Sequence, residues 1–187
     1  MKIDEVGYWS ELKLEIIKKY AAAYSQILAA QKSSLEHHYI DAFAGAGIHV
    51  AKRTGESILG SPLNALNIDP PFKHYHLIDL DGERIEYLRR ITKDRQDVTV
   101  YESDCNTVLL DDVLPKVRYE DYRRALCILD PYRLNPDWTV VAKAGRDEIR
   151  GNIPELHGNG HEHECALEKS ERCCAGTDRA NEPLLGG

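Results

Sequence analysis

The chain has 187 residues, of which 42% are apolar and 29% charged, and these proportions are typical of one globular domain rather than two. Its formal charge of −7 argues against a broad surface for binding nucleic acid, although it leaves room for a local basic cleft. No apolar run approaches the roughly 18 residues of a membrane helix, and the acidic N-terminus lacks the apolar core of a signal peptide. We therefore expect a cytoplasmic protein whose five cysteines are thiols.

Apolar spacing along the first part of the chain predicts helices that alternate with strands. A helix is expected over 9–28, and a buried strand over 38–43 that stops at a glycine turn. A loop rich in glycine, threonine and lysine follows to Gly60, after which Ser61 can cap a helix with Pro62 at its first position. The later elements are expected at 74–80 (strand), 83–91 (helix), 98–101 (strand), 108–113 (helix), 125–129 (strand) and 135–141 (helix). This alternation predicts an α/β fold with a parallel sheet.

Acids or glycines follow the first two expected strands, and ligands bind outside the carboxyl ends of the strands in open α/β sheets. After Asp41, Gly45 and Gly47 let a ligand approach the backbone closely, and a tight turn without a ligand is the alternative. Asp79 can accept hydrogen bonds from a ribose diol; the alternative for Asp79 and Asp81 is a helix cap. A plain dinucleotide site is not expected, because Asp41 and Asp79 lie 38 positions apart rather than about 20 and the full Gly-x-Gly-x-x-Gly is absent.

The third and fourth expected strands each end in a carboxylate. Asp104 can accept a hydrogen bond from an adenine amino group or, alternatively, cap the helix that follows. Asp130 precedes Pro131 and Tyr132, and this rigid turn can receive an amino group and stack a flat substrate on the ring. The alternative for Asp130 and Pro131 is a simple end to the strand.

The order of these motifs resembles that of class I S-adenosylmethionine-dependent methyltransferases, and most closely that of the three-Cys-motif partner (TcmP) family. The resemblance covers residues 5 to about 145, including a long loop at 48–60. The segments that carry it are Val6-Gly7-Tyr8-Trp9-Ser10 with Lys13-Leu14 and Lys19-Tyr20, the run from Tyr39 to Gly47, the run from Gly60 to Leu66, the run from His74 to Asp81, and Leu129-Asp130-Pro131-Tyr132. The resemblance implies a Rossmann-like, three-layer sandwich whose parallel sheet is truncated after the fourth strand.

The resemblance also implies roles for residues at the strand ends, with no metal. Those near the methionine part of S-adenosylmethionine would be Asp41, Ala44, Gly45 and Gly47. Asp79 would lie at the ribose and Asp104 at the adenine. Beside the methyl acceptor, the catalytic residues would be Asp130, Pro131 and Tyr132. Families with Asp-Pro-Pro-Tyr act on amino nitrogens of bases, whereas this chain has one proline, and Arg133 stands where the family usually has glycine.

The family name implies a partner protein that carries three cysteines, of the radical-SAM kind. The leading expectation is a TcmP-like protein with a methyltransferase-like fold that is truncated and therefore binds S-adenosylmethionine weakly or not at all. A second interpretation is a non-catalytic interaction module whose acids are helix caps. A third is an amino-group methyltransferase that acts on DNA or RNA.

The composition changes most sharply near Gly145, so we expect a methyltransferase-like domain over 1–145 and an irregular, disordered tail over 146–187. Back-translation with a shift of one base permits a sequence like the family's continuation, which suggests that this tail is out of frame. The rival interpretation is a zinc site, although the spacing matches no common zinc motif. Its candidate ligands are His161, His163, Cys165, Cys173 and Cys174. Without a fifth strand, the apolar edge at 125–129 would favour aggregation.

Overall fold

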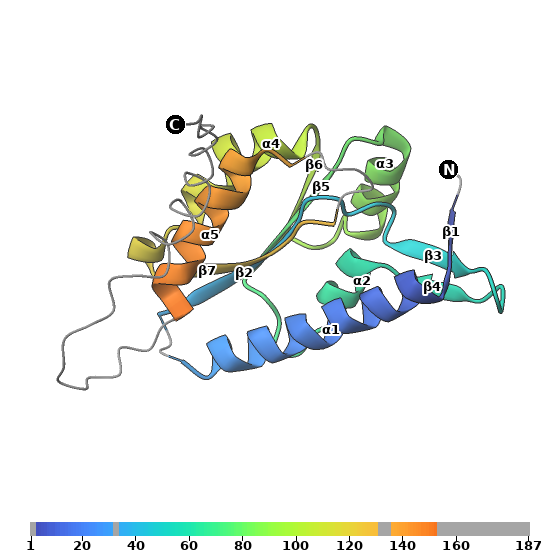
Figure 1. The fold of residues 1–187 in the computed structure, drawn as a ribbon, viewed down its shortest axis with the longest axis horizontal. Coiled ribbons are helices and arrows are strands. Elements are labelled where there is room, and N and C mark those ends of the chain that lie inside the picture. The colour runs from blue at the N-terminus through green and yellow to red at the C-terminus, as the bar shows by residue number, and fades with distance from the viewer. Residues whose placement is uncertain (1–2, 32–33, 131–135, 153–187) are drawn as a thin grey trace, which may run out of the picture. The chain divides into compact units, whose positions relative to one another are not determined.

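Four parallel strands form the central sheet of the computed structural model, which describes residues 3–31, 34–130 and 136–152 (Figure 1). In chain order they are β2 (Glu36–Asp41), β5 (His74–Asp79), β6 (Val98–Glu102) and β7 (Arg123–Ile128). Their order across the sheet is β6-β5-β2-β7, and every neighbouring pair is parallel. Nearly all side chains of β2 and β5 are buried, as expected of central strands covered on both faces.

The direction in which strands are added reverses at β2. The chain moves from β2 outward to β5 and β6, and then crosses back to place β7 on the other side of β2. In the register of the sheet, Asp41 lies between Leu77 of β5 and Ile128 of β7. Such a reversal creates a crevice at the carboxyl ends of the strands, where doubly wound sheets bind their ligands.

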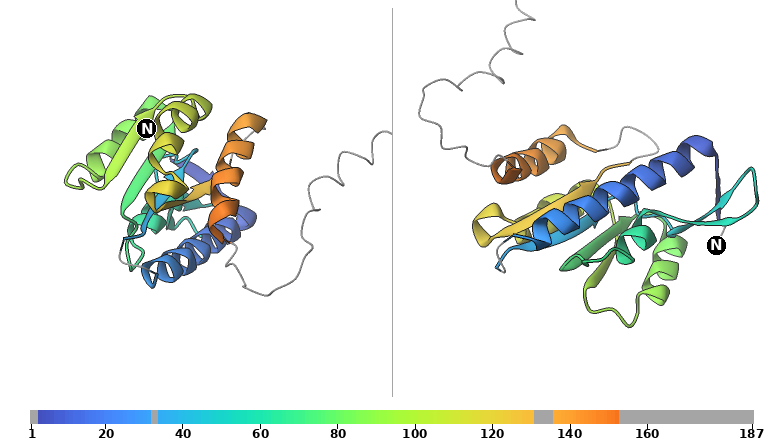
Figure 2. Two further views of the ribbon diagram at one scale, coloured as in Figure 1. Left: turned by 90° about the vertical axis from the view of Figure 1, so that its left-hand side faces the viewer. Right: turned by 90° about the horizontal axis from the view of Figure 1, so that it is seen from below.

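Helices cover both faces of this sheet (Figures 1 and 2). One face carries α1 (Tyr8–Ala29), α2 (Ser61–Leu66) and α3 (Gly82–Ile91). The other carries α4 (Cys105–Thr107), the π-helical η1 (Val108–Val113), the 3-10 turn η2 (Leu114–Lys116) and α5 (Trp138–Asn152). Tyr39 and Leu77 pack into the first core and Ile40 and Ile78 into the second, because successive side chains of a strand point to opposite faces. The predicted α/β fold with a parallel sheet is confirmed, and it is compatible with a Rossmann-like fold.

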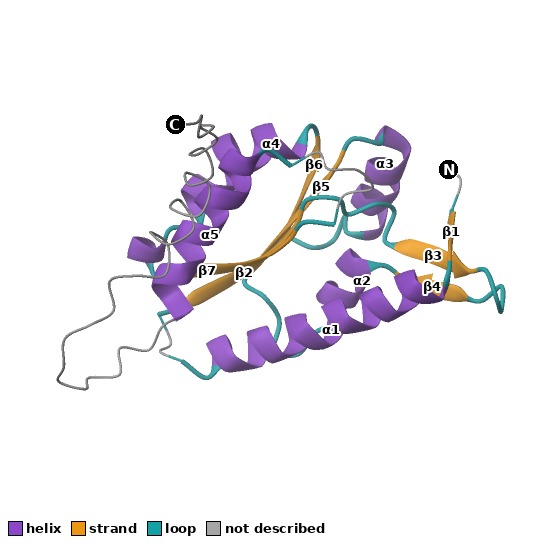
Figure 3. Cartoon of the chain, in the orientation of Figure 1, coloured by secondary structure: helices purple, strands orange, loops and turns teal. Residues whose placement is uncertain are grey.

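A second, three-stranded sheet was missed by the sequence analysis (Figure 3). It consists of β1 (Asp4–Val6), β3 (Ile48–Ala51) and β4 (Ser57–Leu59). β1 pairs in parallel with β3, which pairs antiparallel with β4. The prediction of a plain loop over 48–60 was therefore wrong. These strands have three or four residues each, too few for a periodic signal, and β1 finds its partner only in the tertiary structure.

Several predicted boundaries are confirmed to within one or two residues, and one cap is not. The helix expected over 9–28 is α1, and the strand expected over 74–80 is β5. Gly60, rather than Ser61, occupies the N-cap of α2. Ser61 instead makes a side-chain hydrogen bond with the buried carboxyl of Asp41, so its hydroxyl is used within the core.

The contacts along the chain divide it after Ile153, and the unit that follows lies outside the described residues. The candidate zinc ligands and most of the tail predicted for 146–187 fall in that part. Helix α5 itself continues to Asn152, past the boundary expected at Gly145. Within the described ranges, no helix is both long enough and apolar enough to cross a membrane.

Candidate functional site

The candidate site lies at the switch point, where β2 and β7 end side by side. Asp41 is the last residue of β2, and Asp130 follows β7 by two positions. Pro131 and Tyr132, the other predicted acceptor-side residues, lie outside the described part of the chain. Of the predicted acceptor residues, the structure therefore describes only the carboxylate of Asp130.

Asp41 is a fully buried carboxyl group behind this site. It accepts hydrogen bonds from the Tyr39 hydroxyl at 3.2 Å and the Phe43 backbone N–H at 3.3 Å, in addition to its bond with Ser61. The pKa of Asp41 is raised to about 6, mainly by burial and to a smaller extent by the negative charge of Asp130, although the hydrogen bonds oppose this rise. Ligands cannot reach a side chain that is 1% exposed, so the hydrogen bonds of Asp41 stabilise the site and the carboxyl itself does not contact a ligand.

The turn after β2 has the backbone geometry that its glycines predict. Gly45 and Gly47 have φ angles of 62° and 76°, in the left-handed region that favours glycine. At Gly47 a Cβ atom would also lie 3.0 Å from Leu63 Cγ, so the turn is closely packed on α2. At Gly45 nothing lies within 4 Å of where a Cβ would be, so its outer side is open to a ligand.

Asp79 joins this turn to the end of β5. Its carboxylate accepts a hydrogen bond from the Gly45 backbone N–H at 2.8 Å and another from the Asp81 backbone N–H at 2.9 Å. Each carboxylate oxygen has a second lone pair, so Asp79 keeps the capacity to accept bonds from a ligand. Asp81, not Asp79, is the N-cap of α3, which confirms the cap interpretation for Asp81 alone.

Asp104 is a helix cap. It follows β6, and its side chain accepts hydrogen bonds from the Asn106 and Thr107 backbone N–H groups at 3.0 and 3.2 Å. The cap interpretation is thereby confirmed, and contact with an adenine stays a prediction. Asn106 in turn accepts a bond from the Asp137 backbone N–H at 2.8 Å, which ties the start of α5 to this strand end.

Asp130 forms an ion pair with a lysine of α1. Lys13 Nζ lies 2.8 and 3.0 Å from the two carboxylate oxygens, and both side chains are about half exposed. Lys13 belongs to one of the segments that carry the family resemblance, but the sequence indicated no role for it. The pairing requires α1 to lie over the end of β7, which no local pattern predicts.

A cavity of about 130 Å³ lies beside this ion pair. Its walls include Gly45 from the turn and a second ion pair, in which Arg84 Nη2 lies 2.7 Å from Asp4 Oδ2. His49 of β3 also lines it, and the buried Nδ1 of this ring has no hydrogen-bond partner. Sequence reasoning missed Asp4, Arg84 and His49, because two of them stand on the unpredicted β1–β3 sheet.

The residues present fit S-adenosylmethionine in kind. Gly45 offers an open backbone, Asp79 has spare acceptor capacity, and the buried Nδ1 of His49 has no hydrogen-bond partner within the described residues. The cavity is smaller than the roughly 300–1,000 Å³ of most small-molecule sites, so it can enclose only part of such a cofactor.

A second titratable cluster, of histidines, lies nearer the amino ends of β2 and β5. The rings of His38 and His76 are stacked, with Nδ1 of His38 and Nε2 of His76 3.3 Å apart. His74 is bonded to Thr99 at 2.8 Å, and His76 to the Tyr101 hydroxyl at 3.3 Å. The pKa of His38 is lowered to about 4 and that of His76 to about 3, mainly by burial and to a smaller extent by neighbouring histidines. Nowhere in the described ranges are three or more His, Cys, Asp or Glu side chains grouped so as to hold a metal ion.

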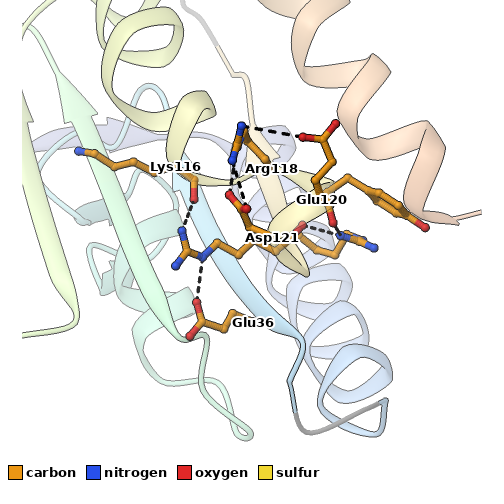
Figure 4. Close-up of polar contacts among 8 residues, drawn as sticks. Glu36, Lys116, Arg118, Glu120 and Asp121 are labelled. Atoms are coloured by element: carbon orange, nitrogen blue, oxygen red, sulfur yellow. Dashed lines mark hydrogen bonds and ion pairs between the residues drawn. The ribbon is translucent and has the colours of Figure 1, made fainter.

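Basic side chains gather before and at the start of β7, around the 3-10 turn η3 (Tyr119–Asp121), but the arginines there are engaged within the protein (Figure 4). The partners are Asp121 for Arg118 at 3.0 Å, Glu36 for Arg123 at 3.1 Å, and the ring of Tyr119 for Arg124 at 3.7 Å. A cluster that is paired in this way offers little charge to phosphates, so it does not favour the nucleic-acid interpretation.

No protein-family model and no curated protein matches this chain. The resemblance to the three-Cys-motif partner family therefore stays a prediction, and the functional argument depends on the site itself.

Proposed function

We propose that this chain is a methyltransferase-like protein of the TcmP kind that binds S-adenosylmethionine at the carboxyl ends of β2 and β5. One observation carries the proposal. The hydrogen bond from Gly45 to Asp79 brings an open glycine turn and an acceptor carboxylate together at the switch point of the sheet. This combination suits a nucleoside with a polar tail, because the carboxylate can accept from a ribose diol and the turn admits a chain close to the backbone.

The residues around the site would mainly bind and orient the cofactor and the methyl acceptor, rather than react with them. When bound, S-adenosylmethionine supplies an electrophilic methyl group. Asp79 would accept hydrogen bonds from the ribose, and Gly45 would line the path of the methionine part. Asp130 would hold an amino group of the acceptor, for which Lys13 Nζ stands in at 2.8 Å. Positioning of this kind accounts for much of the rate gain when two reactants meet in one site.

Equilibrium dialysis of the full chain against labelled S-adenosylmethionine tests the proposal. We expect saturable 1:1 binding that Asp79→Asn weakens about tenfold or more, because hydrogen bonds to a charged acceptor contribute roughly 1.5–3 kcal/mol. The control is Asp94→Asn, which makes the same change at an exposed position outside the site and should leave binding unchanged. The proposal fails if a folded wild-type chain shows no saturable binding, or if both variants bind alike.

A non-catalytic interaction module is the second candidate, because α1 exposes several large apolar side chains. They are Trp9, Ile16, Tyr20 and Ile27, each at least 58% exposed. Apolar surface of this kind often marks a contact with another protein. Under this interpretation the acids only brace the fold, and the dialysis experiment would show no cofactor binding.

A further inference from the structure

The outer edge of β7 is open within the described ranges of the chain. β7 is the last strand of the central sheet and pairs there only with β2. The carbonyls of Tyr122 and Ile128 point toward β2, where they accept hydrogen bonds from the backbone N–H groups of Glu36 and Ala42. Because backbone groups alternate in direction along a strand, those of Ala125 point to the outer edge. Such an edge pairs readily with a strand of another chain.

A stripe of exposed apolar side chains runs along α1 beside this edge. Its members are Trp9, Ile16, Tyr20 and Ile27, each at least 58% exposed, and their spacings of seven, four and seven residues place them on one side of the helix. Lys13, four residues after Trp9, lies on the same side and reaches Asp130 just after β7. The stripe therefore lies on the side of α1 that is nearer to β7, and α1 runs alongside β7 in the right-hand view of Figure 2.

The stripe is symmetrical about the middle of α1. Trp9 and Ile27 each lie nine positions from Lys18, and Ile16 and Tyr20 each lie two positions from it. In an antiparallel pair of identical helices, Trp9 therefore meets the partner's Ile27, and Ile16 meets the partner's Tyr20. Every member of the stripe finds an apolar partner, which is the self-complementarity that a two-fold contact requires.

One two-fold axis can serve the stripe and the strand edge together. Lys13 contacts Asp130 beyond the end of β7, and Ser25 is hydrogen-bonded at 2.8 Å to the β2 residue that pairs with Arg124 at the start of β7. α1 and β7 thus run in opposite directions, and the middle of α1 lies level with Cys127, halfway between Arg124 and Asp130. Rotation about an axis normal to the sheet at this level sets each element antiparallel to its copy.

We propose that this chain forms a two-fold dimer in which the β7 strands pair antiparallel about Cys127 and the two α1 stripes pack on each other. The two central sheets become one continuous sheet, and the closed contact covers both β7 edges. Aromatic side chains bury roughly 150–250 Å² each, so Trp9 and Tyr20, with the two isoleucines and the strand edge, approach the roughly 800 Å² per partner of a standard interface. The inference goes beyond the proposed function and does not depend on cofactor binding.

Analytical ultracentrifugation of the full chain in reducing buffer tests the dimer. Ile16→Glu places a charge in the middle of the stripe, at a position that is 58% exposed in the single copy, so the fold should be preserved, as circular dichroism can check. We expect the wild type to sediment as a dimer and Ile16→Glu to raise the dissociation constant at least tenfold. Lys18→Glu, half a turn away from Trp9 on the opposite, exposed side of α1, is the matched control and should leave the dimer unchanged.

Crosslinking tests the register of the two β7 strands. Directly opposed residues that exchange hydrogen bonds have Cα atoms about 5.5 Å apart, which a disulfide can span. Oxidation by copper–phenanthroline should therefore give a covalent dimer, in which mass spectrometry finds a peptide that joins the two Cys127 residues. Cys127→Ser should remove this peptide.

The proposal is overturned if the wild type is a monomer at the highest concentration tested, or if it forms open-ended aggregates, since a two-fold contact closes at two copies. A dimer that Ile16→Glu leaves intact also overturns it. So does a dimer whose oxidation joins other cysteines and never the two Cys127 residues, because the strands would then not pair about this position.

Discussion

At its carboxyl end β2 buries an acid, Asp41, and two positions from its amino end it buries a histidine, His38. Burial disfavours the charged form of each group, since it raises the pKa of the acid and lowers that of the imidazole. The two ends of β2 differ in the polar groups that surround them. His38 is bonded to the ring of His76, whereas Asp79 and Asp130 at the carboxyl end meet backbone N–H groups and a half-exposed lysine. Hydrogen bonds join the histidines to one another and to Thr99 and Tyr101, and only the buried Nε2 of His38 is left without a partner in this cluster. At the acidic end, Asp79 keeps capacity to accept hydrogen bonds from a ligand.

The two ends should also respond to pH in opposite directions. A histidine whose pKa is lowered on folding stabilises the folded state above pH 6.5 and loses that contribution as the pH falls, because the unfolded chain takes up the proton first. Asp41, whose pKa is raised from 3.8 to about 6, stabilises the fold below pH 3.8 and loses that contribution as the pH rises through 6.

The largest expected effect is loss of stability in acid. Between pH 6.5 and 4, His38 and His76 should each lower the free energy of unfolding by about 1.4 kcal/mol per pH unit, which outweighs the opposite effect of Asp41. Urea unfolding at several pH values measures this slope. His76→Gln should reduce this slope by about 1.4 kcal/mol per pH unit, which corresponds to one proton. His74→Gln should reduce it by less, since His74 is less buried. Equal slopes in the wild type and His76→Gln would contradict the assignment.

A moderate effect is expected from Asp41→Asn, which keeps the shape of the side chain and removes its charge. The variant's stability relative to wild type should rise by about 2–3 kcal/mol between pH 3.5 and 7.5, because only the wild type loses its proton in this interval. Thermal or urea unfolding at the two pH values provides the measurement. A constant difference between the two proteins would show that the pKa of Asp41 is not raised.

The smallest effect is expected at the half-exposed pair of Lys13 and Asp130. Lys13→Met should change the free energy of unfolding by no more than about 1 kcal/mol, as is typical of exposed ion pairs. Lys18→Met, at another exposed position of α1, is the control for the lost charge. A loss of several kcal/mol would mean that the pair is a structural clamp between α1 and β7 rather than an exchangeable contact.

Sequence alone predicted the central sheet because its strands are apolar runs that end at glycine or aspartate. It did not predict β1 and β3, which have only three and four residues, most of them partly buried, and which pair with each other across the fold. It also gave Ser61 the role of a cap, since the local pattern of serine followed by proline contains no trace of the distant Asp41.

The candidate site likewise contains residues that the sequence predicted and residues that it did not. Asp41, Asp79 and Asp130 were found because each closes a strand, and the parallel sheet brings those ends together. His49 and Arg84 were missed because neither belongs to a strand-end motif. A basic side chain on a helix and a histidine in a short strand are ordinary features of a sequence, and only the fold shows that they line one cavity.

The position of β2 in the sheet has a consequence for how the chain forms during synthesis. β2 is made first among the four parallel strands, and it meets β5 after 38 residues in the contact of His38 with His76. Its other neighbour arrives much later, since Glu36 and Arg123 are separated by 87 positions. Until then one edge of β2 has no hydrogen-bonding partner, and such an exposed edge can pair with another chain. Ribosomes that stall before β7 should therefore release products that aggregate more readily than the finished chain.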